Sequence, residues 1–348
     1  MGVAVLVDHL EAVVQAGLPG AVAVASGPGF QYEGAAGLAN VETEEPLTVE
    51  HRFRVASVTK LFIAATVLQL VDDGALALDD EADAIVPGVT LRQLLNHTSG
   101  LPNFDDDLVA FFEPYRKNPA HKSELGPREL LLALALERPR LFPPGEGWAY
   151  TGTNYQALGL VVEETTGTPL RDELRRRIFD PLELGATDLP AETWPVPGLA
   201  RQYVPAENPM FPGPGPGPVD LTELDLPFNW AGGGIVSSGR DLTRFLEALL
   251  GDELLPDHLR AEMLRTVPSG WDESDGYGLG IGKVTALMGK AASPCGAAWG
   301  HLGLGGHTTV ALASERGDRQ VVVMVNGSVL TEEAWEALGG LVWSCYCR

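Results

Sequence analysis

The segment FRVASVTKLFIAATVLQLVDDG, residues 53–74, has apolar side chains on nearly every side of the helix that it predicts. A helix that is apolar all round is buried inside a protein rather than lying on its surface. Lys60 stands near the start of this helix, where an unpaired charge is costly to remove from water. Ser57 precedes Lys60 by three residues, so the hydroxyl and the amine are expected on one face of the helix.

Helical spacing of apolar residues recurs between about residues 85 and 250, and each such segment ends at Gly, Pro or Asp. The segments are TLRQLLNHTSG, PRELLLALALERP, NYQALGLVVEETTG, LRDELRRRIFDPL and GRDLTRFLEALLG. The pattern favours strands at both ends of the chain. AVAVASGPGFQYEGAAGLAN predicts an antiparallel pair around a Gly-Pro-Gly turn, and AWGHLGLGGHTTVALAS with RQVVVMVN predicts adjacent antiparallel strands joined by ERGDR. TEEAWEALGGLVWSCY closes the chain as an amphipathic helix.

This order of elements predicts one α/β subdomain built from both ends of the chain, about residues 1–80 and 265–348. A mainly helical subdomain, about residues 81–264, is inserted between them. Within it, residues 205–220, PAENPMFPGPGPGPVD, are too rich in Pro and Gly for regular structure. This segment is expected either as a loop over a site or as a solvated excursion.

Composition and charge narrow the possible partners. The 348 residues carry a formal net charge of −23, which would repel phosphate backbones and anionic lipid surfaces. Nucleic acid and membranes are therefore not expected as partners, and the oligomeric state is left open. No apolar run is long enough to span a membrane, and the amino terminus carries acidic residues where a secretory signal would be apolar.

The cysteines and histidines predict neither a disulfide framework nor a metal site. Three cysteines, Cys295, Cys345 and Cys347, are an odd number, which indicates reduced thiols and a cytoplasmic protein. Cys345 and Cys347 are expected as two thiols at the end of a helix. The seven histidines show no metal-ligand spacing, and Asp105-Asp106-Asp107 is expected as a solvated charge run. No metal and no cofactor are expected.

Ser57 and Lys60 suggest nucleophilic catalysis. A serine hydroxyl is a weak nucleophile until a base takes its proton, and burial favours the neutral amine that can act as this base. Free N–H groups at the start of the helix could hold an oxyanion. Ser-x-x-Lys by itself occurs by chance in many proteins, so the surrounding sequence must show whether it is catalytic.

Two further segments offer partners for the Ser57–Lys60 pair. Tyr150, in FPPGEGWAYTGTNYQALG, follows a Pro-Gly turn and could pass a proton between the serine and a leaving group, or could be a packing aromatic. GHLGLGG, residues 300–306, is expected on a strand whose glycines let a substrate lie against its edge. His301 in this segment could stay neutral and orient the tyrosine, or could be a polar residue at a strand end.

Together these elements resemble a family of penicillin-binding-protein-like serine hydrolases. The family includes the class C β-lactamases, the DD-peptidases and related esterases. The resemblance runs over nearly the whole chain. LLNHTSGLP, FPPGEGWAYTGTNYQALGLVVEETTG, IFDPLELGATD and AGGGIVSSGRDLTRF look like family signatures in family order. The resemblance implies an α+β, β-lactamase-like fold, with an antiparallel sheet flanked by terminal helices and an inserted helical subdomain.

The resemblance also implies the roles of the site residues. Ser57 would be the nucleophile, and Lys60 and Tyr150 would share general acid and base duty. His301-Leu302-Gly303 would fill the place of the family's Lys-Thr-Gly or His-Thr-Gly triplet, and the N–H groups of Ser57 and Leu304 would hold the oxyanion.

The chain departs from the family where substrate is bound. Gly152 stands where the family usually has the Asn of Tyr-x-Asn, and Asn154, two positions later, need not replace it. Leu302 and Leu304 lack the hydroxyls that help relatives to hold a free carboxylate, although Thr308 and Thr309 lie further along. The departures favour an apolar or neutral acyl-acceptor side and make β-lactams and D-Ala-D-Ala peptides weaker candidates.

The expected function is that of a serine acyl-transfer enzyme, an esterase, amidase or transacylase that works through an acyl-Ser57 intermediate. Its substrate is expected to be a small-molecule ester, thioester or amide, with water, an amine or an alcohol as acceptor, in a biosynthetic setting. A D-alanyl-D-alanine carboxypeptidase or β-lactamase is the alternative within the enzymes. A non-catalytic binding protein on the same scaffold is the alternative outside them.

Overall fold

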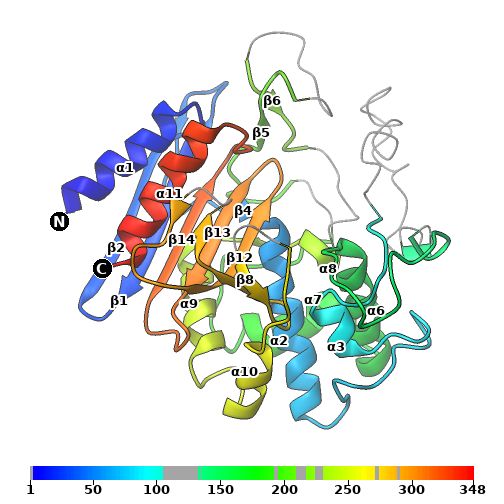
Figure 1. The fold of residues 1–348 in the computed structure, drawn as a ribbon. Coiled ribbons are helices and arrows are strands. Elements are labelled where there is room, and N and C mark those ends of the chain that lie inside the picture. The colour runs from blue at the N-terminus through cyan, green and yellow to red at the C-terminus, as the bar shows by residue number, and fades with distance from the viewer. Residues whose placement is uncertain are drawn as a thin grey trace.

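The core of the protein is an antiparallel sheet of eight strands in the order β3-β2-β1-β14-β13-β12-β9-β8 (Figure 1). The computed structural model describes residues 3–104, 132–133, 135–191, 195–208, 217–223, 230–270, 274–287 and 291–348. The sheet strands are β1 Gly20–Gly27, β2 Phe30–Asn40, β3 Glu45–Pro46, β8 Ser274–Tyr277, β9 Gly282–Val284, β12 Ala298–Leu304, β13 Thr308–Ala313 and β14 Gln320–Val325. Strands from both ends of the chain pair in the middle of the sheet, where β1 lies beside β14.

Helices cover both faces of the sheet, which explains why its central strands are apolar on both sides. The terminal helices α1 (Val3–Gln15) and α11 (Glu332–Tyr346) lie side by side on one face. Helix α9 (Gly239–Leu250) comes from the middle of the chain and packs on β1, β13 and β14. All six residues of β14 are buried.

The remaining helices gather around α2 (Thr59–Asp72), whose side chains are buried from Thr59 through Leu68 and again at Leu70. They are α3 Leu91–Leu95, α6 Gly152–Thr166, α7 Leu170–Leu174, the single-turn π segment η3 Arg175–Phe179, α8 Trp230–Gly233 and α10 Asp257–Met263. Side-chain caps define where several helices begin. Thr90 and Gln93 form a capping box at α3, and Thr151 and Ser238 cap α6 and α9.

The structure confirms the α+β, β-lactamase-like fold class. It confirms the β1–β2 pair and the helices expected in NYQALGLVVEETTG, GRDLTRFLEALLG and TEEAWEALGGLVWSCY. The antiparallel pairing expected across ERGDR is confirmed by β13 and β14. AWGHLGLGGHTTVALAS is two strands and not one, because residues 305–307 turn the chain between β12 and β13.

Two other expected segments fall partly or largely outside the described residues. Residues 127–131 and 134 of PRELLLALALERP lie there, as do residues 209–216 of the Pro-Gly-rich segment. The expectation that 205–220 forms no regular structure is wrong at its end. There, β6 (Val219–Asp220) pairs with β5 (Tyr203–Val204), so the segment returns to the body of the protein.

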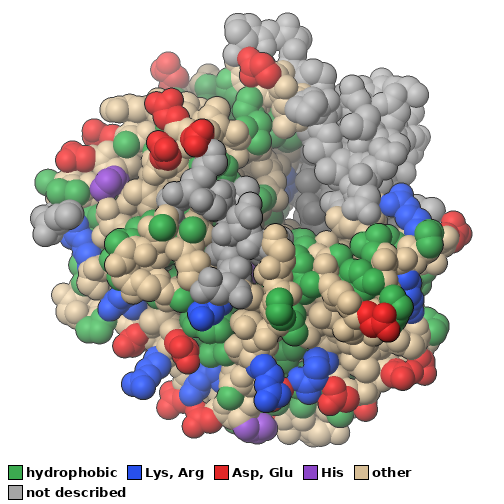
Figure 2. Space-filling model, viewed as in Figure 1, with side chains coloured by type: hydrophobic (Ala, Val, Ile, Leu, Met, Phe, Trp, Pro, Cys, Tyr) green, Lys and Arg blue, Asp and Glu red, His purple; other side chains and the backbone are tan. Residues whose placement is uncertain are grey.

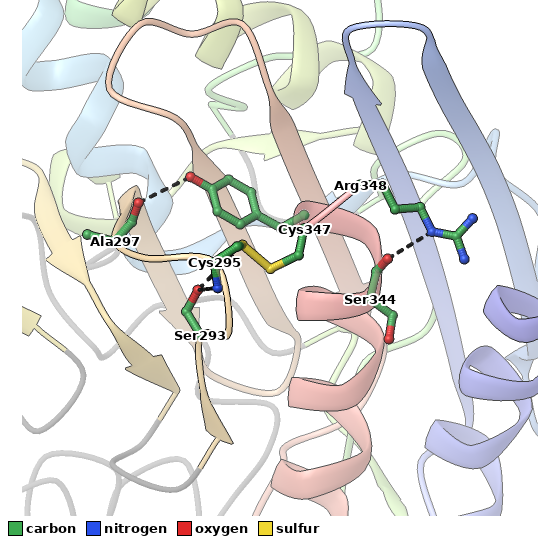
Figure 3. The surroundings of a disulfide bond; sticks show 7 residues. Ser293, Cys295, Ala297, Ser344, Cys347 and Arg348 are labelled. Carbon is green, nitrogen blue, oxygen red and sulfur yellow. Dashed lines mark hydrogen bonds between the residues drawn. A yellow bond between two sulfur atoms is a disulfide. The ribbon is translucent and has the colours of Figure 1, made fainter. Parts of the chain in front are cut away.

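The expectation of reduced thiols is also wrong, because Cys295 and Cys347 form a disulfide across 52 residues of sequence (Figure 3). Two cysteines that are distant in sequence are brought together where the end of α11 meets the segment that leads into β12. Cys345 stays a buried thiol, and burial raises its pKa to about 12. Disulfides persist in oxidising environments, so the thiols no longer support a cytoplasmic location.

Loss of this disulfide is expected to destabilise the protein. A cross-link that closes a loop of this length restricts the unfolded chain and contributes about 4 kcal/mol of stability in the chain-entropy model. The Cys295→Ser/Cys347→Ser double variant should therefore show a lower free energy of unfolding in urea than the oxidised protein. Dithiothreitol should lower the stability of the parent protein but not that of the variant; equal stability of oxidised and reduced parent would contradict the prediction.

The described residues contain neither a membrane-spanning helix nor a metal-binding cluster. None of the helices in these ranges combines the length and hydropathy that a membrane span needs. No group of three or more His, Cys, Asp and Glu side chains in the same ranges is arranged to hold a metal ion. On the face shown in Figure 2, acidic side chains are spread around the rim rather than gathered in one patch.

Candidate active site

Ser57 lies on a sharp turn between strand β4 (Phe53–Arg54) and helix α2. The turn is the short 3₁₀ segment Ala56–Val58, and Ala56 has φ of 46°, a left-handed conformation that non-glycine residues seldom adopt. The backbone of Ile235 holds both sides of the turn: its carbonyl accepts from Val55 N–H at 2.9 Å, and its N–H donates to Thr59 Oγ1 at 3.1 Å. The turn leaves Ser57 partly exposed while the residues after it are buried.

Lys60 lies directly behind this serine. Its Nζ is 3.1 Å from Ser57 Oγ, and the residue is only 2% exposed. The amine also donates to the carbonyl of Gly232 at 2.6 Å, and it lies 5.0 Å from the ring centroid of Tyr150 and 5.4 Å from that of Tyr155. A lysine in such surroundings loses hydration that stabilises its charge, while the Gly232 carbonyl can hold the ammonium once it forms.

Tyr150 lies just before helix α6 and packs in an aromatic cluster with His97. The two ring centroids are 4.4 Å apart, and His97 Nδ1 accepts from the Thr151 N–H at 3.3 Å. Burial lowers the pKa of His97 well below its ordinary value of 6.5, and the charge of Lys60 adds to this effect. His97 is therefore a neutral side chain that positions the segment carrying Tyr150.

His301 is neutral as well, and its tautomer follows from its partners. Its Nδ1 lies 2.6 Å from the carbonyl oxygen of Leu302, which can only accept, so Nδ1 carries the proton. Nε2 then accepts from the Tyr277 hydroxyl at 3.0 Å. Burial lowers the pKa of His301 to about 3, and burial likewise raises the pKa of Tyr277 well above 10.0. The Tyr150 ring centroid is 6.0 Å from that of His301, and the expected role of His301 in orienting Tyr150 stays a prediction.

Strand β12 passes very close to the turn that carries Ser57, and Gly303 makes this approach possible. A Cβ atom at Gly303 would lie 2.0 Å from the carbonyl oxygen of Val55, which no side chain could tolerate. Leu304 follows at the end of β12 and is 50% exposed. The expected oxyanion donors, the N–H groups of Ser57 and Leu304, therefore belong to two segments that the structure brings together.

Two residues expected to bind substrate, Leu302 and Asn154, have buried side chains. Leu302 is 8% exposed and packs in the core beneath α1 and α11, because successive strand residues point to opposite faces. Asn154 is fully buried on α6, where its Oδ1 accepts from Ser99 Oγ at 2.7 Å and its Nδ2 lies 3.1 Å from His97 Nδ1. Asn154 therefore ties α6 to the His97–Ser99 turn, and its expected role in substrate binding stays a prediction.

The threonines after β12 are also unavailable to a substrate. Thr308 is 1% exposed and donates its hydroxyl to the Gly327 carbonyl at 3.0 Å, while Thr309 is 0% exposed. Because both threonines are buried, their hydroxyls are not exposed in the way that carboxylate binding beside the His301-Leu302-Gly303 triplet would need.

Sequence reasoning missed Gly232 and Tyr277. AGGGIVSSGRDLTRF, which contains Gly232, was assigned to the family pattern without a role for the carbonyl that binds Lys60. Tyr277 opens the segment YGLGIGKV, residues 277–284, for which the sequence predicts no role in the site. Gly280 in this segment shows its true constraint, since a Cβ there would lie 2.4 Å from the Ala64 side chain. The sequence signal that could have indicated Tyr277 is an aromatic residue directly before closely spaced glycines.

Comparison with known proteins agrees with this geometry. The chain is 31% identical to penicillin-binding protein 4* of Bacillus subtilis over 173 residues, 48% of this chain and 37% of that protein. It is 31% identical to esterase EstB of Burkholderia gladioli over 307 residues, 79% of this chain and 77% of EstB. The crystal structure of a D-stereospecific amidohydrolase from Streptomyces sp. superposes with a TM-score of 0.82 and 30% identity, covering 99% of this chain and 98% of the other.

The match to penicillin-binding protein 4* thus spans little more than a third of that relative, whereas the matches to EstB and to the amidohydrolase extend over most of both chains. The family model described as Beta-lactamase matches residues 6–338, which include every element that carries the Ser57 site. The chain therefore belongs to the Beta-lactamase family.

Proposed function

We propose that the protein is a serine hydrolase that cleaves small-molecule esters or amides through an acyl-Ser57 intermediate. The observation that carries this proposal is the 3.1 Å contact between Ser57 Oγ and the buried Lys60 Nζ. A base within hydrogen-bond reach of a partly exposed hydroxyl is what nucleophilic catalysis by serine needs. The names of EstB and of the D-stereospecific amidohydrolase support an ester or amide bond as the target.

In the proposed acylation step, Ser57 Oγ attacks the substrate carbonyl carbon while its proton passes to Lys60 Nζ. The Gly232 carbonyl, 2.6 Å away, holds the ammonium, and the backbone N–H groups of Ser57 and Leu304 hold the oxyanion. Tyr150 then gives its hydroxyl proton to the leaving alcohol or amine as the carbonyl re-forms, and Lys60 returns the serine proton to Tyr150, so that both side chains end neutral. In the second step a water molecule attacks the acyl carbon while one of its protons passes to Lys60. That proton returns to Ser57 Oγ as the ester bond breaks, which releases the acid and restores the hydroxyl.

The proposed substrate is neutral on the side that meets the end of β12. A free carboxylate there would have to be held by hydroxyl or cationic groups. Thr308 and Thr309 are buried, and Leu304 is the exposed side chain at this end of the strand. This arrangement favours esters and amides with an uncharged leaving side over D-Ala-D-Ala peptides and β-lactams. Transfer of the acyl group to an alcohol or amine instead of water is an extension of the same chemistry.

The test is the mass added to the intact protein during incubation with p-nitrophenyl esters, acyl thioesters, amino-acid amides and penicillin. We expect a transient acyl adduct from the esters or amides that maps to Ser57 and is absent in Ser57→Ala. Stable labelling by penicillin, or rapid turnover of nitrocefin, would instead support a DD-peptidase or β-lactamase. A folded protein that also fails to react with a fluorophosphonate would be a binding protein on this scaffold.

A further inference from the structure

We propose that the side-chain amide of Asn103 is a substrate-orienting hydrogen-bond donor of this site. The proposal rests on the proposed acyl transfer at Ser57 and adds a contact to it. Asn103 precedes the residues that lie outside the described ranges, is partly exposed, and is bound to the first turn of α6. It was not among the candidates from the sequence, because nothing in the spacing connects it to Tyr150.

The partners of Asn103 settle which way its amide points. Its Oδ1 lies 2.8 Å from the Gly152 N–H and 3.0 Å from Thr151 Oγ1. A backbone N–H can only donate, so the atom facing it must be the carbonyl oxygen of the amide. The NH₂ group is then directed away from α6, and among the described residues it has no hydrogen-bond partner. An amide that is held firmly at its oxygen keeps its two N–H bonds in a constant direction.

Asn103 and Phe104 pack against Gly152, which has no side chain to keep them away. A Cβ atom at Gly152 would lie 2.9 Å from Cε1 of Phe104 and 3.6 Å from Oδ1 of Asn103. The Phe104 ring therefore occupies the space that a side chain at position 152 would need, and the Asn103 amide oxygen lies in contact beside it. The chain lacks a side-chain amide two residues after Tyr150 but has the Asn103 amide bound to the backbone at that position.

The position of Gly152 connects Asn103 to the reacting groups. Gly152 packs against Gly232, since a Cβ at Gly232 would lie 3.6 Å from the Gly152 carbonyl oxygen. The Gly232 carbonyl in turn accepts from Lys60 at 2.6 Å. Asn103 is therefore hydrogen-bonded to the segment that follows Tyr150. The same segment contacts Gly232, whose carbonyl binds Lys60. The Asn103 NH₂ group would donate to a carbonyl oxygen of the substrate that acylates Ser57.

A purely structural role is the competing explanation, because Oδ1 also caps the amino-terminal end of α6. The two roles use different atoms of one side chain, so substitutions can separate them. Asn103→Asp keeps the acceptor oxygen, which a helix amino terminus favours, and loses the NH₂ donor. Asn103→Ala loses both. Asn40→Asp is a matched control, since Asn40 Oδ1 also accepts from two backbone N–H groups, those of Glu42 and Thr43, at the end of β2.

The experiment measures kcat/KM for p-nitrophenyl butyrate, thermal stability, and the rate of labelling by a fluorophosphonate. We expect both Asn103→Asp and Asn103→Ala to lose about 10-fold to 100-fold in kcat/KM, because each lacks the donor. Only Asn103→Ala should lose stability, and Asn40→Asp should match the parent in kcat/KM. Fluorophosphonate labelling of Ser57 should persist in every variant, since it requires the nucleophile rather than substrate orientation.

Each other outcome overturns the proposal in a recognisable way. Parent-like kcat/KM in Asn103→Asp would mean that Asn103 only caps the helix. Loss of kcat/KM in Asn103→Asp but not in Asn103→Ala would mean that the introduced charge acts on the site and the amide does not. A parent protein that neither reacts with fluorophosphonate nor turns over the ester would remove the proposed function itself, and the Asn103 contact with it.

Discussion

Lys60→Met is expected to lower the rate of acylation of Ser57 by about 100-fold to 10,000-fold, the usual contribution of a positioned general base. Methionine occupies nearly the same volume in the apolar interior of α2 but cannot take the serine proton. The Gly232 carbonyl would lose its 2.6 Å partner, which costs about 1–3 kcal/mol, while removal of a buried amine offsets part of this cost. The variant should therefore stay folded, and pre-steady-state release of p-nitrophenol would measure the loss.

Two controls make this result specific to the Ser57–Lys60 pair. Lys283→Met, on β9, replaces a lysine outside the site and should keep the parent rate. Ser57→Ala should give no acyl adduct at all. If Lys60→Met were acylated at the parent rate while folded, another group would be the base and the proposed mechanism would be wrong.

Mild acid is expected to destabilise the fold strongly, because several histidines are buried in their neutral form. Burial lowers the pKa of His301 and of His307 to about 3, from an ordinary value of 6.5, and lowers that of His97 in the same direction. As pH falls below 6.5, the unfolded chain binds these protons and the folded protein does not. Stability is thus complete above about pH 6.5 and is lost progressively toward pH 3.

The expected size of this loss follows from the two histidines with the same depressed value. Each contributes about 1.4 kcal/mol per pH unit, so His301 and His307 together remove about 3 kcal/mol per unit between about pH 6 and pH 4. Urea unfolding at pH 7.5, 6.5, 5.5 and 4.5 would measure the slope. Replacement of the exposed His258 by Gln should leave the slope unchanged. A free energy of unfolding that stays constant from pH 7.5 to 4.5 would show that these histidines are protonated in the folded protein.

Much of the fold follows from periodicity alone. The largely apolar segment 61–71, broken only by Thr66 and Gln69, predicted a central helix, and the two runs of strand-forming residues around Gly-Pro-Gly predicted the β1–β2 pair. Periodicity did not locate the turn between β12 and β13, because HLGLGGHTTV is apolar or small on both sides of the turn. It did not detect the Cys295–Cys347 disulfide either, since an odd count leaves every pairing open and only the packing of α11 beside the lead to β12 selects one.

The reactive pair itself was determined by local sequence. Ser57 and Lys60 share a turn of backbone, so helical geometry brings Nζ to 3.1 Å from Oγ, and the apolar residues that follow exclude water from the amine. Contacts between distant segments determined the partners around the pair: the Gly232 carbonyl accepts from Lys60, Tyr277 donates to His301, and Asn103 Oδ1 accepts from the Gly152 N–H. A hydrogen bond between residues far apart in the chain depends on how whole helices and strands pack, and no pattern within a single segment records that packing.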